Sequence, residues 1–216
     1  MQIHAKNFLS SLTLLATLAL TGCPGGGGDT DTEGTTAGST SNPTSTATMT
    51  DGSSSGGGAT PTCEDYCSSI TTNCSAANSQ YADMDSCMGS CKAFPVGTAA
   101  DTSGNTLGCR IYHAGAAAMD AATHCVHAGP GGAGACGSNC EGFCSIAVAT
   151  CPTEHPDEAT CMTTCMGFMD TEPYDSSDAA GDTLACRLYH LTVASSSAAN
   201  AATHCGHTVA ASPPCM

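Results

Sequence analysis

Beyond residue 62, cysteine and apolar residues recur with the spacing of one face of a helix. The first such face has residues at i, i+3, i+4, i+7 and i+11, namely Cys63, Tyr66, Cys67, Ile70 and Cys74. The same arrangement returns later in the chain as Cys140, Phe143, Cys144, Ala147 and Cys151. No segment alternates with the two-residue period of a strand. We therefore predict an all-α fold.

Two further helices are predicted in each copy of the pattern. The second helix carries Met84, Cys87, Met88, Cys91 and Phe94, matched by Cys161, Met162, Cys165 and Phe168. For the third helix we expect an N-cap at Asn105, and at Asp182 in the copy. Its inward positions are predicted to be Cys109, Tyr112, His113 and Ala116, and in the copy Cys186, Tyr189, His190 and Val193. Each copy is thus predicted to be a three-helix module.

The cysteines divide the chain into two tandem repeats. Repeat 1 spans residues 63–136 and contains Cys63, Cys67, Cys74, Cys87, Cys91, Cys109, Cys125 and Cys136. Repeat 2 spans residues 137–216 and contains Cys140, Cys144, Cys151, Cys161, Cys165, Cys186, Cys205 and Cys215. Matched cysteines are 74 to 80 residues apart, so the two sets keep one order and nearly one spacing. We expect each repeat to close four disulfide bridges of its own.

Two C-x3-C helices can pack antiparallel, which would place Cys63 opposite Cys91 and Cys67 opposite Cys87. In spacing alone this is similar to the twin C-x3-C hairpin of the small mitochondrial translocase chaperones, an analogy of geometry from which no function follows. The other four cysteines of repeat 1 would then pair among themselves. Sequence alone does not choose the pairing, because eight cysteines allow 105 connectivities.

The first 22 residues have the form of a secretory signal peptide. Lys6 precedes a largely apolar run, Phe8–Leu20, that is too short to span a bilayer permanently. The following Leu20-Thr21-Gly22-Cys23 resembles the lipobox of bacterial lipoproteins. The resemblance implies cleavage before Cys23, acylation of Cys23 and anchoring in the cell envelope, with the outer membrane favoured because Pro24 follows the cysteine. In the alternative, an ordinary signal peptide, Cys23 would join a disulfide.

Residues 23–62 form a predicted tether between the lipidated cysteine and the repeats. This segment consists almost wholly of Gly, Ser, Thr, Asp, Ala and Pro, so it cannot bury enough apolar surface to offset the entropy of ordering. We expect it to be disordered and to hold the repeats away from the membrane surface.

Composition limits the partners and the compartment. The chain has a formal net charge of −15 with only four Lys and Arg residues, so it repels phosphate backbones, and we exclude nucleic acid as a partner. Leaving Cys23 aside, the 17 cysteines give an even set, which in an exported chain indicates disulfides. The chain has no Trp and few other aromatic residues, so crosslinks are expected to supply stability that the core lacks.

Six histidines occupy matched positions in the two repeats: His113, His124 and His127, and His190, His204 and His207. Three imidazoles per repeat could hold zinc or copper with an open fourth position. A bridge between Cys109 and Cys125, if it formed, would bring the first three rings together. The alternative is structural, with each ring donating a hydrogen bond to a carbonyl at a helix end. Two matched arginines, Arg110 and Arg187, are expected to tie down a carboxylate or several carbonyls.

Motifs of catalysis are missing from the sequence, including H-E-x-x-H, G-x-S-x-G, C-x-x-C-H and a phosphate-binding glycine loop. We therefore expect a non-enzymatic, lipid-anchored envelope protein whose repeats act as a binding or structural unit for an envelope protein or ligand that the sequence does not identify. The competing hypothesis is a copper- or zinc-binding protein, or a redox carrier, that uses the six matched histidines. The motifs alone assign the eight-cysteine repeat to no family.

Overall fold

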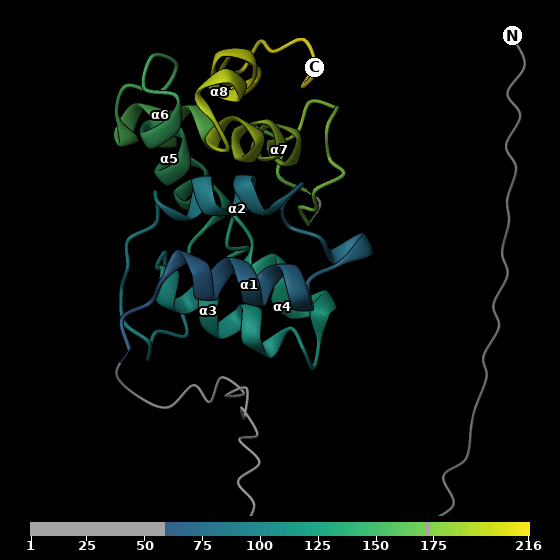
Figure 1. The fold of residues 1–216 in the computed structure, drawn as a ribbon. Coiled ribbons are helices and arrows are strands. Elements are labelled where there is room, and N and C mark those ends of the chain that lie inside the picture. The colour runs from purple at the N-terminus through teal and green to yellow at the C-terminus, as the bar shows by residue number, and fades with distance from the viewer. Residues whose placement is uncertain (1–58, 172) are drawn as a thin grey trace, which may run out of the picture. The chain divides into compact units, whose positions relative to one another are not determined.

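The structure is a computed structural model that describes residues 59–171 and 173–216, all within one compact unit (Figure 1). The predicted signal peptide, the lipidation of Cys23 and nearly all of the predicted tether lie outside the described residues. Repeat 1 consists of α1 (Cys63–Asn73), η1 (Ala76–Asn78), α2 (Met84–Cys91), α3 (Leu107–Ala116) and α4 (Ala121–Ala128). Repeat 2 consists of α5 (Asn139–Thr150), α6 (Glu158–Cys165), α7 (Leu184–Ser195), α8 (Ala198–His204) and η2 (Cys205–His207).

The predicted all-α class is confirmed, since the described residues contain helices and only one isolated β-bridge, between Ser212 and Cys215. The prediction of three helices per repeat is wrong, because each repeat has a fourth α-helix. Side chains restart the helix after a short turn: Asp120 accepts a hydrogen bond from the Thr123 amide before α4, and Ser197 accepts one from the Asn200 amide before α8. The last inward positions of the predicted third helix are Ala116 and Val193, and no helix was predicted for the segments that form α4 and α8.

The N-caps of α3 and α7 lie one residue later than predicted. Thr106, not Asn105, accepts the hydrogen bond from the Cys109 amide, and Thr183, not Asp182, accepts the one from Cys186. Asn105 and Asp182 are instead free to make other contacts. The Asn105 amide donates to Ser145 in repeat 2, and the Asp182 carboxylate binds Arg187.

All eight disulfides of the described residues join cysteines of the same repeat. The two predicted hairpin bridges, Cys63–Cys91 and Cys67–Cys87, are confirmed, and repeat 2 has their counterparts. The bridge considered between Cys109 and Cys125 does not form. The remaining bridges are Cys74–Cys125, Cys109–Cys136, Cys151–Cys205 and Cys186–Cys215. At about 2–4 kcal/mol for a typical bridge, these crosslinks contribute strongly to the stability of a small fold.

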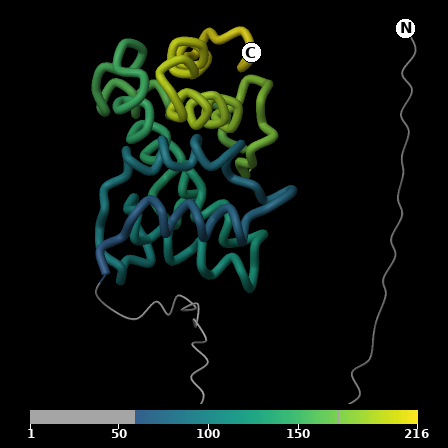
Figure 2. The backbone as a smooth tube through the Cα atoms, viewed as in Figure 1, coloured from purple at the N-terminus to yellow at the C-terminus, as the bar shows by residue number. Residues whose placement is uncertain are grey.

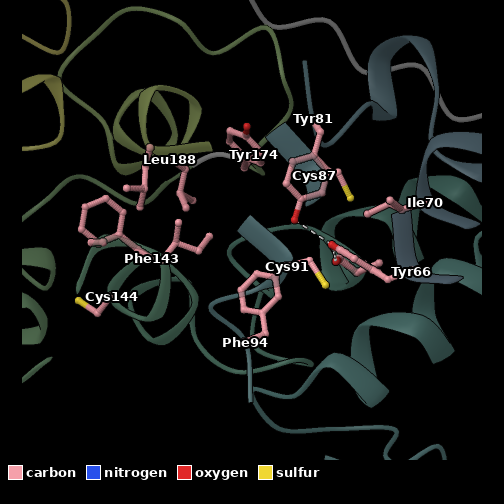
Figure 3. Close-up of a cluster of buried hydrophobic side chains, with 14 of the residues drawn as sticks. Tyr66, Ile70, Tyr81, Cys87, Cys91, Phe94, Phe143, Cys144, Tyr174 and Leu188 are labelled. Atoms are coloured by element: carbon pink, nitrogen blue, oxygen red, sulfur yellow. Dashed lines mark hydrogen bonds between the residues drawn. The ribbon is translucent and has the colours of Figure 1, made fainter. Parts of the chain in front are cut away.

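Half-cystines and a few aromatic rings fill the core (Figure 3). In repeat 1 the Tyr66 ring meets Tyr81 and Phe94 edge-on, with centroids 6.2 and 6.5 Å apart. Tyr66 also donates a 2.6 Å hydrogen bond from its hydroxyl to the Ala128 carbonyl, which ties α1 to the end of α4. Phe143 takes the place of Tyr66 in repeat 2, where it packs against Phe168. The two aromatic groups belong to one continuous cluster of buried residues.

The repeats contact each other through α2 of repeat 1 and α7 of repeat 2, which lie side by side in Figures 1 and 2. The approach is close because position 89 is a glycine: a Cβ there would lie 2.0 Å from the Ser195 carbonyl oxygen. The hydroxyls of Ser90 and Ser195 share a 2.8 Å hydrogen bond across the same contact. At a second contact, a Cβ on Gly142 would lie 2.2 Å from the Pro130 carbonyl oxygen. Glycines thus permit the backbones of the two repeats to touch.

None of the helices in the described residues has the length and apolar character required to cross a bilayer.

Candidate metal centres

The first histidine of each candidate site lies on the third helix of its repeat. His113 follows Cys109 by one turn of α3, and the bridge from Cys109 to Cys136 fixes that face of the helix toward the core. His113 is therefore only 7% exposed, and His190 on α7 has the same exposure beside the bridge from Cys186 to Cys215. The sequence prediction that these two rings point inward is correct.

The other two histidines of each site come from the fourth helix or directly after it. His124 and His127 lie one turn apart on α4, while His204 ends α8 and His207 ends η2. A cysteine between each pair is bridged to the end of the first helix, Cys125 to Cys74 and Cys205 to Cys151. These bridges place the histidine pairs beside α3 and α7.

In repeat 1 the rings of His113, His124 and His127 converge; we call this set trio 1. The Nδ1 atoms of His113 and His124 are 2.9 Å apart, and the His127 ring stands edge-on to His113 with centroids 4.9 Å apart. The three ligand atoms all lie within 4.8 Å of one another. The Nδ1 atom of His127 is buried and has no hydrogen-bond partner. A buried ring nitrogen without a partner is costly unless something binds it.

In repeat 2 the rings of His190, His204 and His207 converge in the same way; we call this set trio 2. The Nδ1 atom of His190 is 2.9 Å from that of His204 and 3.3 Å from that of His207. The His204 ring is stacked on His190, whereas the corresponding rings of trio 1 are tilted. The His207 ring is edge-on to His190, as His127 is to His113. Apart from this tilt, the second repeat thus reproduces the ring arrangement of the first.

A backbone carbonyl holds the outer side of the first ring in each trio. The Nε2 atom of His113 lies 3.3 Å from the Thr102 carbonyl oxygen, and that of His190 lies 3.2 Å from the Ala179 carbonyl oxygen. A carbonyl only accepts, so Nε2 carries the proton and Nδ1 presents its lone pair to the other two rings. Metal-binding histidines are commonly oriented in this way. The sequence could not predict these two contacts, because every residue type has a backbone carbonyl.

Burial lowers the pKa of four of the six trio histidines, which favours their neutral form. In trio 1 burial lowers the pKa of His113 and of His127 below the usual histidine value, and the neighbouring rings lower both further. In trio 2 burial and the neighbouring rings lower the pKa of His190 and of His204. A neutral imidazole offers the lone pair that a metal ion requires, so the lowered pKa values of these four rings favour metal binding.

The cysteines near the trios are not thiolate ligands. The ligand atom of His113 lies within 4.8 Å of the sulfur atoms of Cys109 and Cys136, but these two are bridged to each other. The same holds for His190 beside Cys186 and Cys215, and for Glu154 beside the Cys151–Cys205 bridge. A metal centre in either repeat would therefore have nitrogen ligands. The rings of trio 1 meet although the bridge considered between Cys109 and Cys125 does not form.

Tyr112 was predicted to point inward, and this is wrong: its side chain is 49% exposed. Its ring packs edge-on against the outer part of trio 1, with a centroid distance of 5.1 Å to His113. Tyr189 makes the same contact with His190. The matched tyrosines thus border the trios without a hydrogen bond of their own to the ring nitrogens of His113 or His190 among the described contacts.

The two arginines have the structural contacts predicted for them. Arg110 is fully buried over the Phe94 ring and donates to the carbonyls of Gly129, Thr106 and Pro130. Arg187 is stacked on Phe168 in the same way and also binds the Asp182 carboxylate at 2.9 Å. Both guanidinium groups are thus occupied within the fold.

One comparison with known protein families gives a match. Residues 45–139 are similar to the C-terminal domain of the BfoA family, a stretch that includes the whole of repeat 1. No curated protein and no solved structure gives a significant match to the chain.

Proposed function

We propose that each repeat binds one zinc or copper ion through the three histidines of its trio, with a fourth coordination position open to an external ligand. The protein would be a non-catalytic metal-binding protein of the cell envelope, held to the membrane by acylated Cys23 and a tether. This is the competing hypothesis from the sequence, and the geometry favours it over a purely structural role.

The observation that carries the proposal is that the trio geometry is kept although the chain between its members differs. His113 and His124 are 11 positions apart in the sequence, whereas His190 and His204 are 14 apart, yet the Nδ1 distance is 2.9 Å in both. The equivalent bridges at Cys125 and Cys205 hold the histidine pairs in the same place in both repeats despite this three-residue difference. A shared ligand gives a reason for keeping this arrangement.

The distances are compatible with a metal ion. Tetrahedral zinc with Zn–N bonds of about 2.0–2.1 Å sets neighbouring ligand nitrogens about 3.4 Å apart. The observed Nδ1 separations from the first ring are 2.9 and 3.3 Å in trio 2, so small side-chain rotations would admit the ion. An ion would also satisfy the buried Nδ1 atom of His127. Three imidazoles suit zinc and copper alike, and copper is expected to bind more tightly.

Charge and compartment support the same proposal. A chain with a net charge of −15 attracts cations and disfavours nucleic acid, and the cysteines of its described residues are all committed to bridges. In an oxidising compartment histidine is then the residue left to bind a transition metal. The fourth position would permit transfer of the ion to and from another ligand without a large movement of the fold.

Metal titration of the exported, detergent-solubilised protein tests the proposal. After stripping with a chelator, we expect two equivalents of Zn²⁺ or Cu²⁺ to bind, as measured by calorimetry and elemental analysis. His113→Ala should bind one equivalent, and the double variant with His190→Ala should bind none. The matched control is His155→Gln, since His155 is a buried histidine outside both trios that shares a hydrogen bond with Thr208. Failure of the disulfide-intact protein to bind either metal would overturn the proposal and favour the structural role.

A further inference from the structure

A disulfide holds the segment that supplies two of the three ligands in each repeat, which is α4 in repeat 1 and α8 with η2 in repeat 2. The bridge joins a cysteine next to those ligands to a distant part of the chain. Cys125 lies directly after His124 and two residues before His127, and its partner Cys74 is the C-cap of α1. In repeat 2 Cys205 lies between His204 and His207 and is bridged to Cys151, the C-cap of α5.

These two bridges close the longest loops in their repeats. Cys74 and Cys125 are 51 residues apart and Cys151 and Cys205 are 54 apart, whereas the other bridges span 17 to 29 residues. Opening a long loop restores the most entropy to the chain. Loss of either long bridge therefore frees more of the repeat than loss of any other.

The helices held by these bridges are short. α4 has eight residues and α8 has seven, well below the length at which an isolated helix is stable in water. At the far end of α4 the Tyr66 hydroxyl donates to the Ala128 carbonyl and Arg110 donates to the Gly129 carbonyl, so these hydrogen bonds supplement the bridge. The ligand on α3, His113, is held by a different bridge, Cys109–Cys136. Each trio thus consists of two separately crosslinked pieces.

We propose that the Cys74–Cys125 and Cys151–Cys205 disulfides control metal retention, so that their reduction releases the ion and the bound ion protects them from reduction. This rests on the proposed function and adds a redox control to the same sites. The reductant would be a dithiol. Its first thiolate attacks one sulfur of the bridge and displaces the other, and its second resolves the mixed disulfide. Two cysteine thiols and a cyclic disulfide of the reductant are the products.

The protection follows from linkage. Cys125 is fully buried and Cys74 nearly so, so a reductant reaches the bridge only when α4 detaches. A metal held by His113 on α3 and by the two histidines on α4 keeps α4 in place. If the detached form does not bind metal, the ion should slow reduction by a factor of one plus the ratio of free metal to Kd, about 100-fold at a ratio of 100.

The first test compares two variants in a His190→Ala background, in which trio 1 alone is measured. Replacing both cysteines of the Cys74–Cys125 bridge by serine should weaken Zn²⁺ binding at least tenfold. The matched control replaces Cys63 and Cys91, a pair on α1 and α2 away from the trio, and should change the affinity less than threefold. Far-UV circular dichroism verifies that both variants retain their helices. Equal affinities in the two variants would overturn the proposal.

The second test needs no cysteine variant. The wild-type protein is reduced by a water-soluble phosphine, which binds zinc weakly and is oxidised to the phosphine oxide with oxygen from water. New thiols are alkylated and located by peptide mass. With Zn²⁺ present, Cys74 and Cys125 should become alkylated at least tenfold more slowly, while the rate at Cys63 and Cys91 changes little. An unchanged rate at Cys74 and Cys125 in protein that demonstrably holds zinc would refute the redox control. Protein that binds no zinc would instead refute the proposed function.

Discussion

The Nδ1 atoms of His190 and His204 lie 2.9 Å apart, the same distance that separates His113 from His124 in the other repeat. If this equality reflects a common ligand, the two trios should bind Zn²⁺ with affinities within about tenfold of each other. Isothermal titration of His113→Ala and of His190→Ala, each of which keeps one site, measures the two affinities separately. A difference of several hundredfold would show that one trio has lost the binding role.

Bound metal should raise thermal stability. An ion that binds only the folded state stabilises it by about 2.7 kcal/mol when its free concentration is 100 times Kd. We expect a higher melting temperature with Zn²⁺ in wild-type protein and an unchanged one in the double variant His113→Ala/His190→Ala. Differential scanning calorimetry with and without the metal makes the comparison. An equal increase in the double variant would place the binding elsewhere.

Stability of the metal-free protein should fall as the pH falls below about 6.5, the pKa of an unperturbed histidine. Burial lowers the folded-state pKa of His113, His155 and His190, so below that pH the unfolded chain binds more protons than the fold does. The stabilisation is complete above pH 6.5 and is lost as the pH approaches the lowered pKa values. Urea unfolding at pH 8, 6.5 and 5 should give a decreasing midpoint. An increasing midpoint would mean that the rings are charged in the fold.

Gly89 and Gly115 give a matched pair for testing the contact between the repeats. A Cβ at Gly89 would meet the Ser195 carbonyl at 2.0 Å, whereas one at Gly115 would meet no atom within 4 Å. Gly89→Ala should therefore cost at least about 2 kcal/mol of unfolding free energy. Gly115→Ala should gain about 0.5–1 kcal/mol, because alanine is the better helix former. Chemical denaturation with the disulfides intact measures both, and equal effects would contradict the close contact.

Arg187 should contribute far more to stability than its carboxylate partner. Removing the guanidinium in Arg187→Met leaves several buried carbonyls without a donor and should cost about 3–5 kcal/mol. Asp182 is mostly exposed, so Asp182→Asn should cost less than about 1 kcal/mol. Denaturant unfolding of both variants gives the comparison. A large effect of Asp182→Asn would show that the ion pair, rather than the carbonyl contacts, retains the arginine.

Local spacing in the sequence was sufficient to predict the all-α class, the first three helices of each repeat and the hairpin bridges. Cys63 and Cys67 lie one turn apart, as do Cys87 and Cys91, so helical geometry nearly determines their pairing. The Cys74–Cys125 bridge could not be predicted in this way, because it depends on a turn that reverses the chain between α3 and α4. The same turn, which ends at the Asp120 cap, created the unpredicted fourth helix.

The sequence identified the residues of the candidate sites but not how their side chains are arranged. Matched positions identified all six histidines, yet nothing in the sequence showed that His127 would be buried without a partner or that Thr102 would orient His113. N-cap positions were off by one, because Asn105 and Thr106 are both good caps and tertiary contacts decide between them. The contact between the repeats was also not predicted, because it depends on Gly89, and a single glycine follows no periodic pattern.

Gly89 makes the two repeats non-equivalent at the α2–α7 contact. Cys87 and Cys91 correspond to Cys161 and Cys165, so the residue in repeat 2 that matches Gly89 is Thr163. A threonine carries the Cβ for which the α2–α7 contact has no room. Repeat 1 can therefore dock onto a following unit through its second helix, but repeat 2 cannot use the same face to recruit another. The α2–α7 contact therefore cannot be repeated from repeat 2 to a further copy of the module, so it does not extend the pair into a filament.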